Sequence, residues 1–212
     1  WQRATFEDRA EDVMEGLEML RSRKEADMDR IALFGHGTGA YIAQIVAADD
    51  DEQIAALLNL AAPAFDYRTS LMNAFHGEYV CSGIDSARAY DKARRQTKSS
   101  LGWVNAFPII KKWRQSKVNK DFENKEYLST LLIPTLFVYA EHDDEIYPEW
   151  STDSLRVLFR NDIPDYFSLV TIPEANHSFR VAEPCFQGDI NTTPFSDVFR
   201  REIRDWVMST LK

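Results

Sequence analysis

The chain has 212 residues, 44% hydrophobic and 28% charged, which is enough for one globular core. Its formal charge of −9 argues against nucleic acid as a partner, and no apolar run reaches the length of a membrane-spanning helix. Cys81 and Cys185 can form one disulfide or stay two thiols, and they have no zinc-ligand spacing. We expect no metal, no cofactor and no membrane span, with the cytoplasm slightly favoured as the compartment.

The chain opens with the pattern of an amphipathic helix. Thr5 and Asp8 have the spacing of a capping pair. Apolar residues then recur at helical spacing and predict one buried face. These residues are Ala10, Val13, Met14, Leu17 and Leu20.

A glycine-rich turn follows the predicted strand at residues 31–34. Gly35-His36-Gly37-Thr38-Gly39 has the frame Gly-x-Ser-x-Gly of a nucleophile elbow, a sharp strand-to-helix turn that lifts its central side chain above the sheet. Gly35 and Gly39 keep the small positions that let the backbone pack tightly, while Gly37 replaces the serine. Residues 38–48 predict a buried helix and residues 54–61 another strand. Together they indicate a βαβ unit of a parallel sheet.

Two later predicted strands each end in a loop with ionisable residues. Residues 133–139 are followed by Asp143 and Asp144, and residues 166–172 are followed by His177. A serine nucleophile needs a histidine as general base and a carboxylate that orients it. The order along the chain is nucleophile position, acid, histidine, which is the order of the α/β hydrolases.

On these segments the chain resembles the α/β-hydrolase superfamily, and most closely its esterase, acyl-hydrolase and serine-aminopeptidase-like branch. FGHGTG, IPTLFVYAEHDDEIYP, IPEANHSF and the closing helix REIRDWV carry the resemblance. It implies an α/β fold with a mostly parallel sheet flanked by helices. It also implies His177 as general base, Asp143 as its orienting acid with Asp144 as the alternative, and the backbone N–H of Thr38 as an oxyanion donor.

The resemblance further divides the chain into a core, residues 1–62 and 129–212, and a helical cap or lid at residues 63–128. Within the lid, a basic helical pattern at residues 86–100 is followed by Trp103, Phe107 and Trp113, which either form the lid core or line an acyl pocket.

In this superfamily the opening helix comes just before the nucleophile strand. We therefore expect the earlier strands, and the loop with the second oxyanion donor, to be missing from this chain. An unpaired apolar edge would then be covered by a partner segment or by a second polypeptide.

The function expected from these features is hydrolysis of a small-molecule carboxylic ester, thioester or amide by a Ser-His-Asp-type mechanism. Gly37 leaves three explanations open: an engineered serine-to-glycine variant, a natural pseudo-hydrolase, or an enzyme in which His177 activates a water beside Gly37. The alternative function is that of a non-catalytic pseudo-hydrolase, which binds a ligand or a protein partner through the former active-site pocket.

Overall fold

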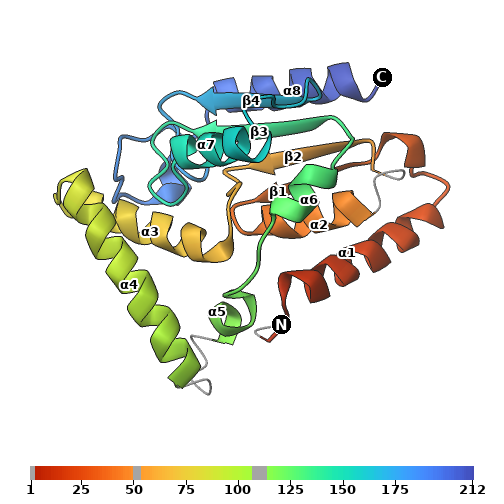
Figure 1. The fold of residues 1–212 in the computed structure, drawn as a ribbon. Helices are drawn as coiled ribbons and strands as arrows, with labels where there is room; N and C mark the ends of the chain where they lie inside the picture. The colour runs from red at the N-terminus through yellow and green to blue at the C-terminus, as the bar shows by residue number, and fades with distance from the viewer. Residues whose placement is uncertain (1–2, 50–53, 107–113) are drawn as a thin grey trace.

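The computed structural model describes residues 3–49, 54–106 and 114–212. A four-stranded sheet with the order β1-β2-β3-β4 forms its centre, and all neighbouring strands are parallel. Each strand needs a crossover connection to the next, and helices fill these connections (Figure 1). The strands are β1 Ala32–His36, β2 Ala56–Leu60, β3 Thr135–Ala140 and β4 Phe167–Ile172.

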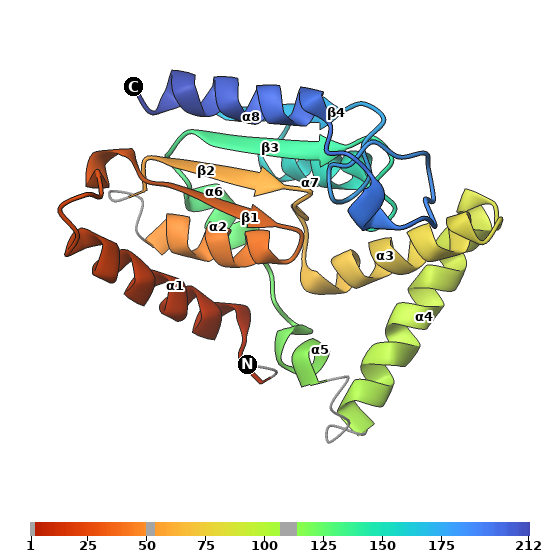
Figure 2. The same ribbon diagram turned by 180° about the vertical axis from the view of Figure 1, so that it is seen from behind.

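Helices cover both faces of the sheet (Figures 1 and 2). One buried cluster joins α1, α2, α6 and α7 to one face, and a second cluster joins α8 to the other. Within the described residues, no helix combines the length and the apolar character needed to cross a bilayer. The helices are α1 Phe6–Arg21, α2 Gly39–Asp49, α3 Tyr67–Cys81, α4 Ser86–Ala106, α5 Arg114–Asn119, α6 Lys125–Thr130, α7 Pro148–Leu158 and α8 Asp197–Thr210, with 3-10 turns η1 Met28–Arg30 and η3 Ile190–Thr192.

The opening helix forms as its sequence predicts. The N–H of Asp8 donates to Thr5 Oγ1 at 3.0 Å, and the N–H of Thr5 donates to Asp8 Oδ2 at 2.7 Å. This reciprocal pair is a capping box that satisfies two free donors at the start of α1. Leu17 is buried, but Leu20 is exposed, since it lies in the last turn of α1 beyond the buried cluster.

Residues 63–128 contain α3 and α4, which pack on each other and project away from the sheet (Figures 1 and 2). The same segment also reaches the core, because Leu128 of α6 is fully buried there. The expected lid boundary at residue 128 thus falls inside α6, and the division into core and lid stays a prediction. Trp103 lies exposed on α4, and Phe107 and Trp113 lie outside the described residues.

The two cysteines form one disulfide, which settles the alternative left open by the sequence. Cys81 is the last residue of α3, and Cys185 lies in the long loop after β4, with 5.2 Å between their Cα atoms. The bridge therefore joins the projecting helices to the loop region that also carries His177.

Strand β1 is an edge of the sheet. Among the described residues it has a hydrogen-bonded neighbour on one side, β2. Its Phe34 side chain is 73% exposed, although it belongs to the same face as buried Leu58 of β2. The described part of the chain therefore presents an unpaired apolar edge at the strand that leads into the glycine turn.

Candidate active site

The glycine turn has the geometry of a nucleophile elbow. Gly37 follows β1 directly and has a φ of +53°, in the left-handed region that favours glycine. Its N–H donates to the carbonyl of Leu60 at 2.9 Å, which continues the β1–β2 pairing into the turn. A Cβ at Gly35 would lie 2.5 Å from the Cα of Ala40, so the close contact between β1 and α2 requires glycine there.

Gly39 differs from Gly35. A Cβ built at Gly39 meets no atom within 4 Å among the described residues outside its own helical turn. The tight packing expected at both small positions is therefore found at Gly35 alone.

His177 and Asp143 form a hydrogen-bonded pair. Nδ1 of His177 lies 3.0 Å from Oδ1 and 2.9 Å from Oδ2 of Asp143, which is only 2% exposed. Oδ1 also accepts the backbone N–H groups of Glu145 at 2.9 Å and Ile146 at 2.8 Å. These bonds hold the carboxylate in one orientation, so that it fixes both the tautomer and the direction of the imidazole ring.

The structure thus brings Asp143, and not Asp144, to the histidine. Oδ2 of Asp144 instead lies 3.5 Å from Sγ of Cys81. Burial raises the pKa of Asp144, and the neighbouring charge of Asp143 adds to that rise.

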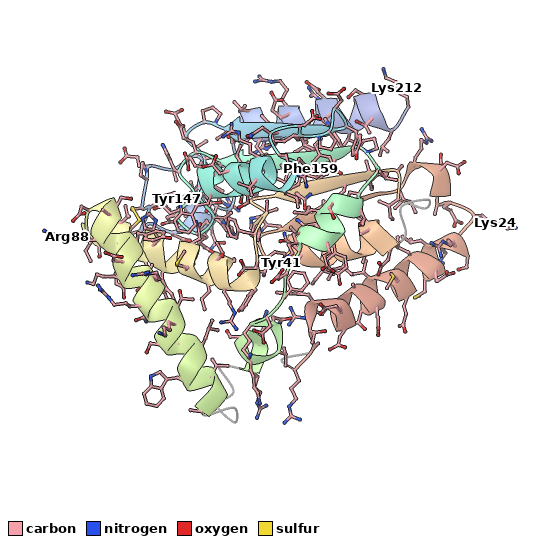
Figure 3. All side chains as sticks on the ribbon, in the orientation of Figure 1. Lys24, Tyr41, Arg88, Tyr147, Phe159 and Lys212 are labelled. Atoms are coloured by element: carbon pink, nitrogen blue, oxygen red, sulfur yellow. A yellow bond between two sulfur atoms is a disulfide. The ribbon has the colours of Figure 1, made fainter. Side chains whose placement is uncertain are left out.

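Helix α3 holds the loop that carries these acids. The backbone N–H of Tyr147, which lies beside α3 at the start of α7 (Figure 3), donates to Oδ1 of Asn73 at 2.8 Å. A Cβ at Gly77 would overlap the carbonyl oxygen of Asp144, so glycine lets α3 approach the loop closely. Sequence reasoning missed both residues, because their partners lie about 70 positions away in the chain.

His36 also acts on His177. Its Nε2 donates a hydrogen bond to the backbone carbonyl of His177 at 2.8 Å, and the two ring centroids lie 4.6 Å apart. Because a carbonyl can only accept, this contact places a proton on Nε2 of His36.

The other nitrogen of His177 faces a second carboxylate. Oε2 of Glu145 lies 3.7 Å from Nε2 of His177. Burial by itself lowers the pKa of His177, but the hydrogen bond and charge of Asp143, with the charges of Glu145 and Asp144, outweigh burial and raise the pKa above its ordinary value.

A cavity of about 280 Å³ opens beside His177 and Glu145. Gly37, Thr38 and His177 line it from the sheet side, and residues of α3 line it from the other. Thr38 directly precedes α2, and its backbone N–H has no hydrogen-bond partner in the described part of the chain. Such an N–H at the start of a helix is a suitable donor to an oxyanion.

The elbow points at the base. A Cβ built at Gly37 would lie 3.3 Å from Nε2 of His177, so a hydroxyl on that carbon would fall within hydrogen-bond reach. The site therefore combines a buried carboxylate, a histidine and a glycine turn in the arrangement that a serine hydrolase requires, with no side chain at the apex.

Solved structures share this fold at low sequence identity. The chain matches a thermophilic esterase from Thermogutta terrifontis (TM-score 0.59, 18% identity, 99% of this chain and 74% of that one). It also matches an α/β hydrolase from the sediment metagenome of the Mar Chica lagoon, Morocco (TM-score 0.57, 13% identity, 97% of this chain and 70% of that one). A third match is Porphyromonas gingivalis dipeptidyl peptidase 4 (TM-score 0.54, 16% identity, 95% of this chain and 22% of that one), so the chain spans less than a quarter of that protein.

The fold is therefore the α/β-hydrolase fold. No curated protein sequence matches the chain significantly. The sequence model of the prolyl oligopeptidase family matches residues 1–187, which is most of the chain and includes the elbow, Asp143 and His177. On this match, the chain belongs to the prolyl oligopeptidase family.

Proposed function

We propose that this protein is a hydrolase of carboxylic ester, thioester or amide bonds, with His177 as general base and Asp143 as its orienting acid. The observation that carries the proposal is the geometry at Gly37: a Cβ there points at Nε2 of His177 from 3.3 Å, while Nδ1 is held by a buried carboxylate. Family membership supports the same conclusion.

The geometry favours the following chemistry. A hydroxyl at position 37 attacks the substrate carbonyl and passes its proton to Nε2 of His177, while Asp143 stabilises the resulting imidazolium. The N–H of Thr38 donates to the oxyanion that develops on the carbonyl oxygen. His177 then returns the proton to the leaving group, and a water repeats the sequence to release the acid. Because Gly37 supplies no hydroxyl, we expect the chain as it stands to retain only a residual rate.

A second function is favoured by Gly37 itself. An ordered His177–Asp143 pair beside a 280 Å³ cavity, with no nucleophile, also suits a pseudo-hydrolase that binds a ligand or a protein partner without turning it over. The two functions differ in whether a hydroxyl at position 37 restores catalysis.

The test compares Gly37→Ser with Gly37→Ala, because the alanine variant adds the same Cβ without the hydroxyl. Hydrolysis of p-nitrophenyl butyrate and of a peptide p-nitroanilide is followed for both variants and for the parent chain, with circular dichroism to check folding. We expect Gly37→Ser to show a burst and a rate at least about 10³-fold above Gly37→Ala. A folded serine variant with no gain on either substrate would instead support the binding function.

The exposed edge of β1 supports a proposal about partners. We infer that a further segment or a second polypeptide pairs with β1, covers Phe34 and brings the second oxyanion donor. Amide hydrogen exchange in the natural protein tests it, because a paired outer edge protects the amides of β1, whereas fast exchange there would contradict the pairing.

A further inference from the structure

A second cavity lies on the other side of α3 from the catalytic cavity. Tyr67, Leu71 and Ala74 of α3 line the catalytic cavity, whereas Arg68 and Met72 line the second one. Residues three or four apart share one side of a helix, so the two sets face different directions. The second cavity has a volume of about 380 Å³ and is formed by α3 and α4, and we call it the α3–α4 groove.

Among the described residues, the wall of the α3–α4 groove carries cations and no carboxylate, in a chain whose formal charge is −9. Arg68, Arg94 and Lys98 all line it. Arg68 pairs with Asp121, and Arg94 lies 3.6 Å from Asp91, but all four side chains are more than half exposed, and such pairs contribute little. Lys98 makes no ion pair within the described ranges. With three cations in its wall against these two neighbouring carboxylates, the groove keeps an excess of positive charge.

The floor of the groove is apolar and has free space. Met72 and Leu101 supply its side chains, and Gly102 leaves open space, because a Cβ built there meets no atom of the described residues outside its own helical turn within 4 Å. The volume falls in the range of small-molecule pockets, whose walls are mostly apolar with a few polar groups that orient the ligand.

Thr97 supplies a polar group without a partner. It lines the groove, is only 7% exposed, and its Oγ1 has no hydrogen-bond partner among the described residues. Buried hydroxyls are normally hydrogen-bonded, so this donor lacks an acceptor. Because this oxygen is buried beneath the groove surface, the Thr97 side chain must rotate toward the groove before it can donate to a carboxylate oxygen held between Arg94 and Lys98.

We propose that the α3–α4 groove binds a long-chain carboxylate, with its head group against Arg94, Lys98 and the hydroxyl of Thr97 and its chain along Met72 and Leu101. An inorganic anion would contact only the cations of the wall, and a neutral hydrocarbon would contact only the apolar floor. The site is separate from the catalytic cavity and does not depend on the hydrolase function.

Dodecanoate is the probe, with dodecanol as the uncharged comparison and acetate as the chainless one. Calorimetry measures affinity, and the ¹³C signal of the Met72 methyl group and the ring signals of His177 report which cavity is occupied. We expect dodecanoate to shift the Met72 signal and leave His177 unchanged, and dodecanol and acetate to bind at least about tenfold more weakly.

Two matched pairs of variants locate the site. Gly102→Phe fills the groove, whereas Gly16→Phe places the same side chain at a helical glycine of α1 that also has open space. Arg94→Gln removes a groove cation, whereas Arg88→Gln removes one that points away from the sheet at the start of α4 (Figure 3), and each arginine pairs with an aspartate three residues earlier.

We expect Gly102→Phe to abolish the Met72 shift and Arg94→Gln to weaken binding about tenfold, with both controls like the parent chain. Equal binding of dodecanol, a dodecanoate shift at His177 instead of Met72, or full binding by folded Gly102→Phe would each overturn the proposal.

Discussion

The two sides of the cavity beside Gly37 and His177 are built in different ways. On the base side, side chains hold the site: Asp143 binds Nδ1 of His177, His36 binds its carbonyl, and a disulfide ties its loop region to α3. On the elbow side, backbone holds the shape of the turn, through the positive φ of Gly37 and the close contact at Gly35, and the side chain of His36 links the turn to the base side.

This difference explains how the elbow can keep its shape without a nucleophile. The turn depends on the contact of Gly35 with α2 and on the bond from the Gly37 N–H to β2, and neither involves a side chain at position 37. The base side does depend on its side chains, because each of its contacts involves a particular side-chain atom. Substitutions on the two sides should therefore affect different measurements.

The largest effect should come from the base side in the Gly37→Ser background. His177→Ala and Asp143→Asn should each reduce kcat for p-nitrophenyl butyrate by about 10³- to 10⁴-fold, because they remove the base or its correct tautomer. His142→Gln is the control, since that ring binds the carbonyl of Ala182 and should change kcat only a few-fold. Equal rates in His177→Ala and its parent would show that the hydrolysis comes from elsewhere.

Removal of the disulfide should have the next largest effect. Cys81→Ala with Cys185→Ala opens a covalent loop between residues 104 positions apart, which should lower the free energy of unfolding by about 2–5 kcal/mol in urea titrations. A reducing agent should destabilise the parent chain similarly and leave the double variant unchanged. A parent chain that is insensitive to reductant would refute this role of the bridge.

Two equivalent substitutions test separately whether each small position of the elbow requires glycine. Gly35→Ala should destabilise the fold by about 1–3 kcal/mol, because its Cβ meets the backbone of Ala40. Gly39→Ala should stay within about 1 kcal/mol of the parent chain, since it has open space and alanine is the better helix former. Thermal unfolding of the pair is the measurement, and equal losses would mean that both glycines are sterically required.

The smallest effect should be electrostatic. Glu145→Gln should lower the pKa of His177 toward its ordinary value, while the hydrogen bond to Asp143 continues to raise it; NMR titration of the ring measures this. Glu149→Gln, at an exposed residue in the first turn of α7, is the control and should leave the pKa unchanged. An equal fall of the His177 pKa in both variants would show that Glu145 has no specific effect on His177.

The same pKa has a consequence for stability. Folding raises the pKa of His177, so the charged ring stabilises the fold below about pH 6.5, the ordinary value for histidine. This contribution is lost as the pH rises through the folded pKa. The charged groups that face the ring are Asp143, Asp144 and Glu145.

Much of the fold could be predicted from local patterns. The four parallel strands are short apolar runs, and the residues expected at the site lie at or just beyond the carboxyl ends of β1, β3 and β4. The resemblance predicted a helical lid at residues 63–128, but no local pattern marked α3 within it, because the buried residues of α3 are Ser70, Asn73, His76 and Gly77, which produce no apolar periodicity. Its start does carry a local signal, since Asp66 accepts the N–H of Thr69 at 3.0 Å as an N-cap.

The details of the site depended on tertiary contacts. Asp143 and Asp144 are adjacent, so spacing alone could not decide between them, and the approach of Gly77 to Asp144 places the neighbouring carboxylate on His177. The contact of Glu145 with Nε2 likewise depends on how two loops far apart in the chain meet.

The disulfide also has a topological consequence. Cys81 and Cys185 enclose β3, α7 and β4, as well as Asp143 and His177. A protease that cuts the chain once anywhere between them, for example in the exposed connection after α3, therefore leaves two fragments that are still covalently joined. Such nicked protein would migrate as a single species in electrophoresis until a reducing agent is added. Analyses that always include reductant would mistake it for two separate polypeptides.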